Sequence, residues 1–280
     1  MRKLKLTSIL GAVAAMIVGG TAIPALAADK PETITESIKI PNSTVTFDLV
    51  KLPAGKVTFK DKDGKDKEAE IKSVWIGKLE TRWDEFDVYW QKLDLNLDQQ
   101  KAGYDSENRP SKPYAPPDRG FGHQGWPAGS VTYSEAEKYV KWLSKSTKKK
   151  YRLPTVAEWT YAAKAGGAGE KLKAEQLKEV AWFSANSQGA QGDQPMESGK
   201  KKPNAWGLYD TLGNVAEWAI REDGTPVVMG GSFQDDADDV TVNSQAEYTE
   251  KWQKDDPQDP KGHSWMSNGA HVGIRVVRED

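Results

Sequence analysis

The densest group of potentially reactive side chains in this 280-residue sequence is a run of aspartates. The run consists of Asp235, Asp236, Asp238 and Asp239. Paired carboxylates can act as general acid and base in hydrolysis, and carboxylate oxygens are ligands for hard cations. Most runs of like charge are nevertheless solvated loops. The run therefore indicates either a polar binding surface or an exposed loop.

Histidine offers a second kind of chemistry. The sequence contains three histidines, His123, His263 and His271, and no cysteine. Histidine and aspartate are ligands for iron or zinc, but the spacing of these residues matches neither a facial triad nor a zincin motif. The absence of cysteine excludes disulfides and thiol chemistry. Metal redox chemistry through histidine and aspartate stays open beside ordinary surface or core histidines.

An acid, Glu217, lies between Ala216 and Trp218 at the end of the largely apolar segment from Asn204 to Trp218. Burial of a carboxylate is costly unless a partner satisfies it. Backbone or tryptophan N–H groups are one set of partners, and a bound cation is the other.

The segment Tyr151 to Gly167 predicts a strand that leads into a short buried helix. Thr155 and Glu158 have the spacing of a capping box, and Gly166 with Gly167 ends the helix. A first helix is predicted from Thr81 and Asp84, with Phe86, Tyr89, Trp90 and Leu93 on its core face. Ser134 and Glu137 predict the cap of another helix.

The segment from Gly103 to Gly129 has little periodicity and is rich in proline, glycine, arginine and aromatic residues. Long irregular segments inside a compact domain are commonly functional. We expect an ordered loop whose Arg109, Tyr114, Arg119 and Trp126 line a groove, with plain packing of these side chains as the alternative.

The first residues read as an export signal. Arg2, Lys3 and Lys5 precede an apolar stretch from Ile9 to Val18, and Ala25-Leu26-Ala27 is a small-x-small cleavage site. A membrane anchor is the rival interpretation, but Gly19, Gly20 and Pro24 interrupt the apolar run. We expect a signal peptide at 1–27, a flexible lead-in at 28–45, one domain at 46–280, and an extracytoplasmic location.

The charge balance excludes some partners. Lysine and arginine number 39 against 41 acids, which gives a net charge of −2. Neither nucleic acid nor, after signal cleavage, a membrane is an expected partner. A peptide or an exported protein is the expected partner of a monomer.

Four ordered motifs resemble the formylglycine-generating enzyme (sulfatase-modifying factor) family. They are RLPTVAEWTYAAKAGG, PNAWGLYDTLGNVAEWA, GGSF at Gly230 to Phe233 and GIRVV at Gly273 to Val277. The resemblance spans roughly Phe47 to Val277. It implies a mixed α/β (α+β) fold of C-type-lectin-like form, rich in irregular structure.

The resemblance also implies a copper site that this sequence lacks. In the family, two cysteines after the GGSF motif hold copper, and an ungapped comparison places Asp235 and Val240 at those positions. Met229 replaces the arginine that usually opens the motif. Copper(I) requires soft thiolate ligands, so we expect neither copper nor formylglycine formation.

Calcium is the structural ion that the resemblance implies. The two family sites map onto Gly213, Val215 and Glu217, and onto Asn186, Ser187 and Asp193. Backbone carbonyls and carboxylates are suitable calcium donors. The alternative for Glu217 is a purely hydrogen-bonded acid.

Two functions remain open. In the first, the chain is a binding or accessory factor for a peptide or exported protein, whose groove combines Asp235 to Asp239 with the loop from Gly103 to Gly129. In the second, it is a protein- or peptide-modifying oxidoreductase with a non-thiol metal site. The missing thiolates favour the first.

Overall fold

A five-stranded antiparallel sheet organises the fold and takes its strands from both ends of the described chain. The computed structural model describes residues 33–113, 115–167, 169, 171–249, 252 and 266–280. Across the sheet the strands follow the order β1 (Thr35–Lys39), β2 (Thr46–Leu52), β5 (Val74–Gly77), β13 (Val277–Arg278) and β6 (Tyr151–Arg152). β13 therefore lies between β5 and β6 and pairs with both.

A second sheet of four strands carries Glu217 and lies next to the aspartate run. Its order is β11 (Gln245–Ala246), β10 (Pro226–Met229), β9 (Ala216–Ile220) and β12 (Val272–Gly273). β10 is antiparallel to β9 and β11, whereas β12 is parallel to β9. Two ribbons complete the strands, β3 (Gly55–Lys60) with β4 (Asp66–Ile71) and β7 (Gln188–Gly189) with β8 (Gly192–Asp193).

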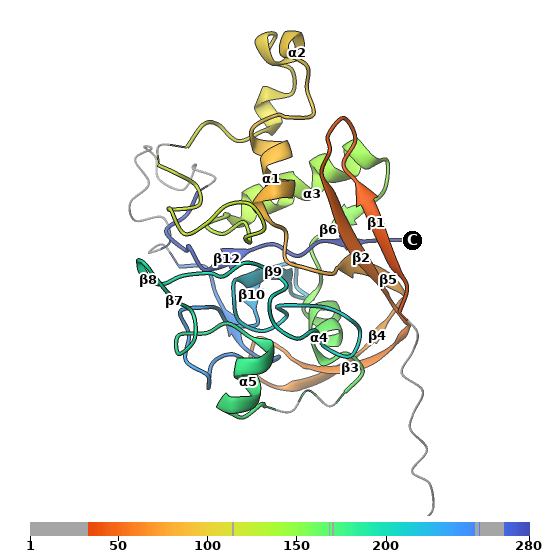
Figure 1. The fold of residues 1–280 in the computed structure, drawn as a ribbon. Helices are drawn as coiled ribbons and strands as arrows, with labels where there is room; N and C mark the ends of the chain where they lie inside the picture. Colours follow the sequence, from red (N-terminus) through yellow and green to blue (C-terminus); the bar gives the residue numbers. More distant parts are fainter. Residues whose placement is uncertain (1–32, 114, 168, 170, 250–251, 253–265) are drawn as a thin grey trace, which may run out of the picture. The chain divides into compact units, whose positions relative to one another are not determined.

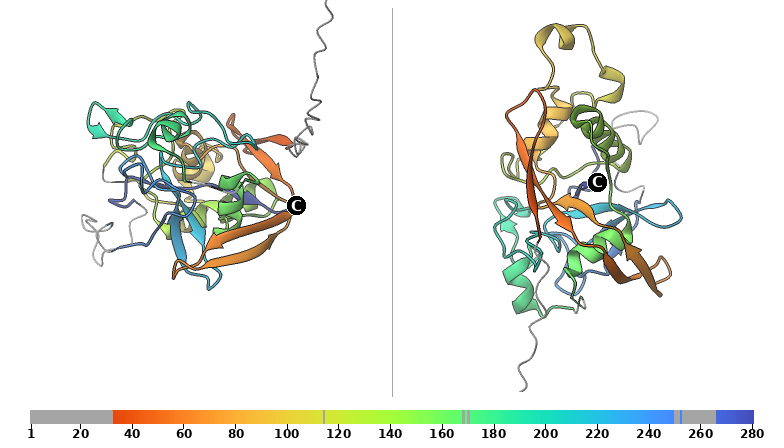
Figure 2. Two further views of the ribbon diagram at one scale, coloured as in Figure 1. Left: turned by 90° about the horizontal axis from the view of Figure 1, so that it is seen from below. Right: turned by 90° about the vertical axis from the view of Figure 1, so that its right-hand side faces the viewer.

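The helices are short. They are α1 (Trp83–Trp90), α2 (Leu97–Lys101), the 3-10 helix η1 (Ser106–Asn108), α3 (Tyr133–Thr147), α4 (Val156–Lys164) and α5 (Ala174–Val180). α2 lies beyond α1, away from both sheets (Figures 1 and 2). The capping box predicted for α4 is confirmed, because the Glu158 N–H donates to Thr155 Oγ1 at 3.1 Å and the Thr155 N–H donates to Glu158 Oε2 at 2.9 Å.

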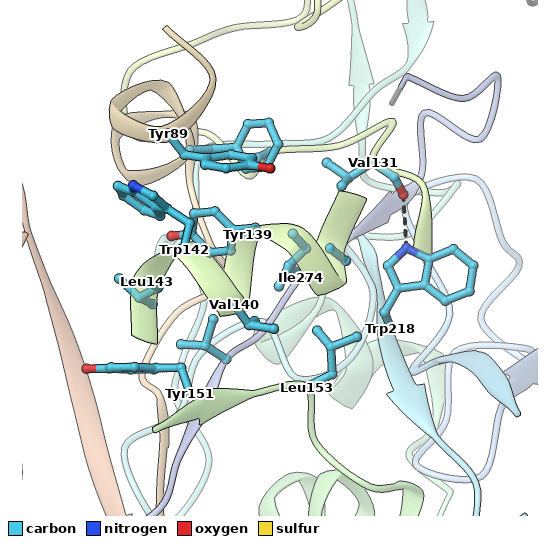
Figure 3. Packing of buried hydrophobic residues seen from close by; sticks show 14 of the residues in the cluster. Tyr89, Val131, Tyr139, Val140, Trp142, Leu143, Tyr151, Leu153, Trp218 and Ile274 are labelled. Atoms are coloured by element: carbon cyan, nitrogen blue, oxygen red, sulfur yellow. Dashed lines mark hydrogen bonds between the residues drawn. The ribbon is translucent and has the colours of Figure 1, made fainter. Parts of the chain in front are cut away.

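The larger apolar core packs α3 against α1 and the sheets (Figure 3). Tyr89 of α1 and Tyr139 of α3 meet edge to face, with ring centroids 5.6 Å apart, and Trp142 packs on both rings. Trp218 of β9 closes the core from the second sheet, and its Nε1 donates to the Val131 carbonyl at 2.9 Å. Aromatic packing thus contributes much of the stability of this cysteine-free domain, in which no disulfide can form.

A second core lies under α4. Trp159 and Tyr161 of this helix are buried with Trp206 and with the apolar face of the β3–β4 ribbon. The ribbon approaches the helix so closely at Gly55 that an added Cβ would lie 2.2 Å from the Tyr161 hydroxyl. Glycine is therefore required at this position.

Three details of the sequence-based expectation are wrong. The lead-in 28–45 contains β1, an edge strand of the main sheet, because its residues hydrogen-bond with β2. The first helix is capped at Arg82, with Glu85 as its boxed acid, and α3 is capped at Thr132. Leu93 is 51% exposed and lies after the helix, not in its core stripe.

The fold class, mixed α/β with much irregular structure, is confirmed. The signal-peptide prediction at 1–27 lies outside the described residues, as do Tyr114 and His263. Among the described residues, no helix combines the length and apolar character that a membrane crossing requires.

Candidate functional site

The partner of Glu217 is Arg275. Both side chains are 1% exposed, and Arg275 Nη2 lies 2.7 Å from Glu217 Oε1. Arg275 Nε lies 2.9 Å from both carboxylate oxygens, and Trp159 Nε1 donates to Oε2 at 2.6 Å. A buried charge pair is tolerated when hydrogen bonds satisfy its remaining donors and acceptors. Glu217 is therefore a fully partnered structural acid.

The remaining donors of Arg275 tie three segments together. Nη1 donates to the Gly77 carbonyl of β5 at 2.8 Å, and Nη2 donates to the carbonyls of Tyr209 at 2.8 Å and Asp210 at 3.1 Å. The guanidinium has a planar fork of five N–H donors, which suits several carbonyls at once. Arg275 thus connects the second sheet to the first.

Two further buried acids surround this pair. Glu80 accepts from the Val215 N–H at 3.0 Å, from Asn214 Nδ2 at 2.9 Å and from Ser198 Oγ at 3.0 Å. Burial, with the charges of Asp210 and Glu217, raises the pKa of Glu80 well above its usual range. Burial likewise raises the pKa of Asp210 to about 6. The sequence does not predict this cluster, because no local spacing connects Glu80 or Asp210 to Glu217 and Arg275.

The side chains proposed for calcium have other partners. The Glu217 carboxylate is held by Arg275 and Trp159, which leaves a guanidinium where a cation would have to lie. Asn186 Oδ1 accepts from the Phe183 N–H at 2.8 Å, which closes a turn. No group of three or more histidine or acidic side chains in the described residues is arranged to hold a metal ion. The side chains of Glu217 and Asn186 are thus engaged within the protein.

Ser187 and Asp193, the other two residues of the second calcium set, also have partners within the protein. Ser187 is buried and its Oγ donates to the Phe233 carbonyl at 2.8 Å. Asp193 lies exposed on the β7–β8 ribbon, where Gln188 Nε2 donates to it. Calcium remains a prediction that rests on the resemblance.

The GGSF turn positions the first residue of the aspartate run. Gly230 and Gly231 adopt the positive φ values 95° and 72°, which favour glycine. The next residue, Ser232, donates to Asp235 Oδ2 from its N–H and from its Oγ, both at 2.7 Å. Asp235 is thus fixed at the position that the resemblance gives to a copper cysteine.

Val240, at the other copper position, is 2% exposed and packs with Leu177 and Phe183. Its side chain belongs to a small apolar cluster. The two positions that the resemblance gives to copper cysteines therefore carry one carboxylate, at Asp235, and one buried isopropyl group, at Val240.

Asp235 lines a pocket of about 290 Å³ at the edge of the second sheet. The lining residues are Ala216, Val228, Gly231, Asp235, Asp239, Ser244, Gln245, Ala246 and His271. Burial lowers the pKa of His271, and the nearby Asp235 charge only partly opposes this. The imidazole is therefore neutral at pH 7, and the pocket combines two carboxylates with a neutral ring.

An aromatic corner stands beside His271. The Trp252 ring meets the imidazole edge to face, with centroids 5.2 Å apart, and also packs on Trp218 at 6.0 Å. Tyr248, which is 46% exposed, packs on Trp252 at 5.9 Å. These contacts hold His271 and its neighbours in one orientation.

The rest of the aspartate run has separate partners. Asp236 accepts from Ser184 Oγ at 2.9 Å, and Asp238 pairs with Lys171 at 2.6 Å. Only Asp235 and Asp239 of the run line the pocket. Two aspartates of the run therefore line a pocket and two have partners outside it, and a binding role for the run stays a prediction.

The groove predicted from the loop at Gly103 to Gly129 is corrected at Arg109. Arg109 is 6% exposed and forms a bidentate pair with Asp94, with Nη1 and Nη2 at 2.8 and 2.9 Å from its oxygens. Its guanidinium also lies over the ring of Trp142. Arg109 is a packing residue and offers no charge to a ligand.

Arg119 and Trp126 are half-buried and are not among the residues that line the Asp235 pocket. Arg119 donates to Ser130 Oγ at 2.8 Å and to the carbonyl of Ser267. Trp126 packs against the larger core. A groove shared by both loops stays a prediction for these two residues.

A larger hollow of about 620 Å³ lies between the β3–β4 ribbon and α4. Its main charged groups neutralise one another, because Arg152 pairs with Glu158 at 2.7 Å and with Glu279 at 2.8 Å. We therefore place the candidate site at the smaller pocket, whose acids form no ion pair with any described residue.

Comparison with known proteins identifies the family of this chain. The Sulfatase-modifying factor enzyme 1-like domain matches residues 36–280. The formylglycine-generating enzyme of Mycobacterium tuberculosis is 33% identical over 110 residues, and the match spans only 34% of that enzyme. It covers 35% of this chain.

Two further relatives carry names that do not describe an active oxidase. The chaperone protein LppX of Paenibacillus barcinonensis is 26% identical over 218 residues, which are 63% of this chain and 72% of that protein. The inactive C-alpha-formylglycine-generating enzyme 2 of Bos taurus is 28% identical over 137 residues, 44% of each chain.

Solved structures show the same fold. Treponema denticola variable protein 1 has a TM-score of 0.63 at 20% identity, and covers 88% of this chain and 99% of its own. PvdO from Pseudomonas aeruginosa has a TM-score of 0.62 at 21% identity, and covers 88% and 98%. Since the domain match extends over residues 36–280, this chain belongs to the Sulfatase-modifying factor enzyme 1-like (FGE-sulfatase) family.

Proposed function

We propose that this protein is an exported binding or accessory factor, which holds a peptide segment of another exported protein in the pocket around Asp235 and His271. One observation carries the proposal. Of the two positions that the resemblance gives to copper cysteines, Asp235 lines the pocket, and Val240 is buried in an apolar cluster outside the pocket lining. The pocket can hold a bound molecule, but the thiolates that would coordinate copper are absent.

The relatives support an accessory role. LppX is named a chaperone, and its match covers most of both chains, while the bovine relative is named inactive. The apolar stretch and cleavage site at 1–27 support export. A fold shared with enzymes does not itself imply catalysis, since function depends on the residues at the site.

The test uses a variant that fills the pocket. Ala246 lines the pocket and is exposed, so Ala246→Trp places a ring in the cavity without disturbing the core. Ala102, exposed at the end of α2, gives the matched control Ala102→Trp. A library of random dodecapeptides is selected on the purified wild-type protein, and binding of the enriched peptides is measured by fluorescence anisotropy.

The wild type and Ala102→Trp are expected to bind the enriched peptides equally, whereas Ala246→Trp binds at least about tenfold more weakly, which corresponds to a loss of about 1.4 kcal/mol. Absence of any enriched peptide, or equal binding by Ala246→Trp, refutes the proposed function.

A further inference from the structure

Among the described residues, no basic side chain compensates the negative charge of the candidate pocket. Asp235 and Asp239 both line it, and no lysine or arginine is among its lining residues. In the described part of the chain, neither aspartate forms an ion pair, although Asp238 between them is neutralised by Lys171. Carboxylates that converge without a counter-charge favour a cationic ligand.

The other polar groups around the pocket do not supply a positive charge to balance the aspartates. His271 is neutral, because burial lowers its pKa. Gln245 turns its side chain away, since its Nε2 donates to the Lys60 carbonyl at 2.7 Å. Arg221, which donates to Gln245 Oε1, is paired with Glu247 at 3.2 Å.

Aromatic rings beside His271, which lines the pocket with the two carboxylates, add a second feature of cation sites. Trp252 is held edge to face against His271, and Tyr248 packs on Trp252. Aromatic faces attract ammonium and guanidinium groups, and they pack against the aliphatic stems of lysine and arginine. A metal ion would gain nothing from these rings.

The size of the pocket selects the ligand further. Pockets that hold drug-sized ligands have volumes of about 300 to 1,000 Å³. The volume of this pocket, about 290 Å³, is just below that range, which suits a single side chain of a peptide better than a whole ligand. We infer that the pocket receives a cationic side chain, the ammonium of lysine or the guanidinium of arginine, from the bound peptide. This inference rests on the proposed function and specifies its ligand.

The test varies one charge in a fixed peptide. The probes are fluorescein-labelled Gly-Ser nonapeptides whose central residue is lysine, arginine, Nε-acetyl-lysine, norleucine or glutamate. Binding is measured by anisotropy at low salt with EDTA, so that divalent metal ions do not contribute. The lysine and arginine peptides are expected to bind at least about tenfold more tightly than the others, and added salt reduces this difference because it screens the carboxylates.

Two isosteric variants locate the effect. Asp239→Asn removes an exposed pocket carboxylate, and Asp238→Asn removes the neighbouring carboxylate that is paired with Lys171. We expect the preference for lysine over norleucine to fall about tenfold in Asp239→Asn and to persist in Asp238→Asn. Melting temperatures of both variants check that the fold is intact.

The outcomes separate this inference from the proposed function. Equal binding of the lysine and norleucine peptides, abolished by Ala246→Trp, overturns the cation inference and leaves the peptide-binding function standing. An equal loss of preference in Asp238→Asn and Asp239→Asn also overturns it, because the charge would then act through the general field of the surface. Binding of no probe and no library peptide removes both.

Discussion

Arg275 has the most extensive set of buried contacts of any charged residue described above. It pairs with Glu217 and donates to the carbonyls of Gly77, Tyr209 and Asp210. Removing one partner of a buried pair leaves an uncompensated charge, which costs about 3–5 kcal/mol in measured cases. The guanidinium therefore provides the positive charge that a structural cation would otherwise provide.

This arrangement predicts the response to chelators. Because Arg275 already neutralises Glu217, EDTA is expected to leave the melting temperature of the purified protein unchanged. Differential scanning fluorimetry with EDTA, and again with added calcium, provides the measurement. A decrease that calcium reverses would support the calcium set of Gly213, Val215 and Glu217, since a ligand that binds only the folded state stabilises it by mass action.

The sequence indicates that Glu217 needs a hydrogen-bond donor, but it does not indicate which residue provides it. An acid among aromatics requires a donor, and a tryptophan N–H was among the donors considered. Arg275 is 58 positions away, and no local spacing connects the two residues. His271 was likewise not predicted as a pocket residue. Its position beside Asp235 depends on the parallel pairing of β12 with β9, which no local pattern indicates.

At the scale of elements, an imidazole joins α1 to the loop that follows Asp118. His123 Nε2 lies 2.8 Å from Asp87 of α1, and Nδ1 lies 2.8 Å from Asp118. The ring stacks on Trp83, with centroids 5.3 Å apart. Burial lowers the pKa of His123, but the hydrogen bonds and charges of the two aspartates outweigh it, so the net shift is upward.

This contact predicts a pH-dependent contribution to stability. A raised folded-state pKa means that the contribution is complete below the unfolded pKa of about 6.5 and is lost as the pH rises through the folded pKa. His123→Gln is therefore expected to destabilise the protein by about 1 kcal/mol at low pH, since the site is partly exposed, and by less at high pH.

Urea denaturation of the wild type and His123→Gln at pH 5.5 and pH 8.5 measures this difference. A gap between the two proteins that stays constant, or that widens at pH 8.5, would contradict the assignment of a charged imidazole between two aspartates.

Elements were predictable where the signal is local. The Thr155 and Glu158 box is a four-residue motif, and it was located correctly. For α3 the same spacing occurs twice, and the helix uses Thr132. The choice depends on tertiary contacts, because Glu135 accepts a hydrogen bond from the Tyr89 hydroxyl at 2.5 Å. A sequence motif cannot distinguish two overlapping caps when a distant side chain selects one.

At the scale of the whole molecule, the main sheet depends on β13. Val277 is fully buried and pairs with Ile76 on one side and Arg152 on the other. The predicted mixed α/β class follows from the order of strands and capped helices. The central position of the last strand does not, since strand order in a sheet is a property of distant pairing.

A charge in this strand should therefore unfold the domain. Val277→Asp is expected to cost at least about 3 kcal/mol, because an unpaired carboxylate would be buried. Ser37→Asp, at an exposed position of the edge strand β1, is the matched control and should change stability by no more than about 0.5 kcal/mol. Urea denaturation followed by circular dichroism gives both values, and similar costs for the two variants would refute the central role of β13.

The central place of β13 also determines when the protein can fold. Synthesis proceeds from residue 1 toward residue 280, so β5 and β6 are made long before the strand that joins them. Until Val277 and Arg278 have left the ribosome, the facing edges of β5 and β6 have no strand to pair with. Sheets that depend on distant pairing form slowly for this reason. A nascent chain of this protein is therefore expected to complete its main sheet only after β13 has been synthesised.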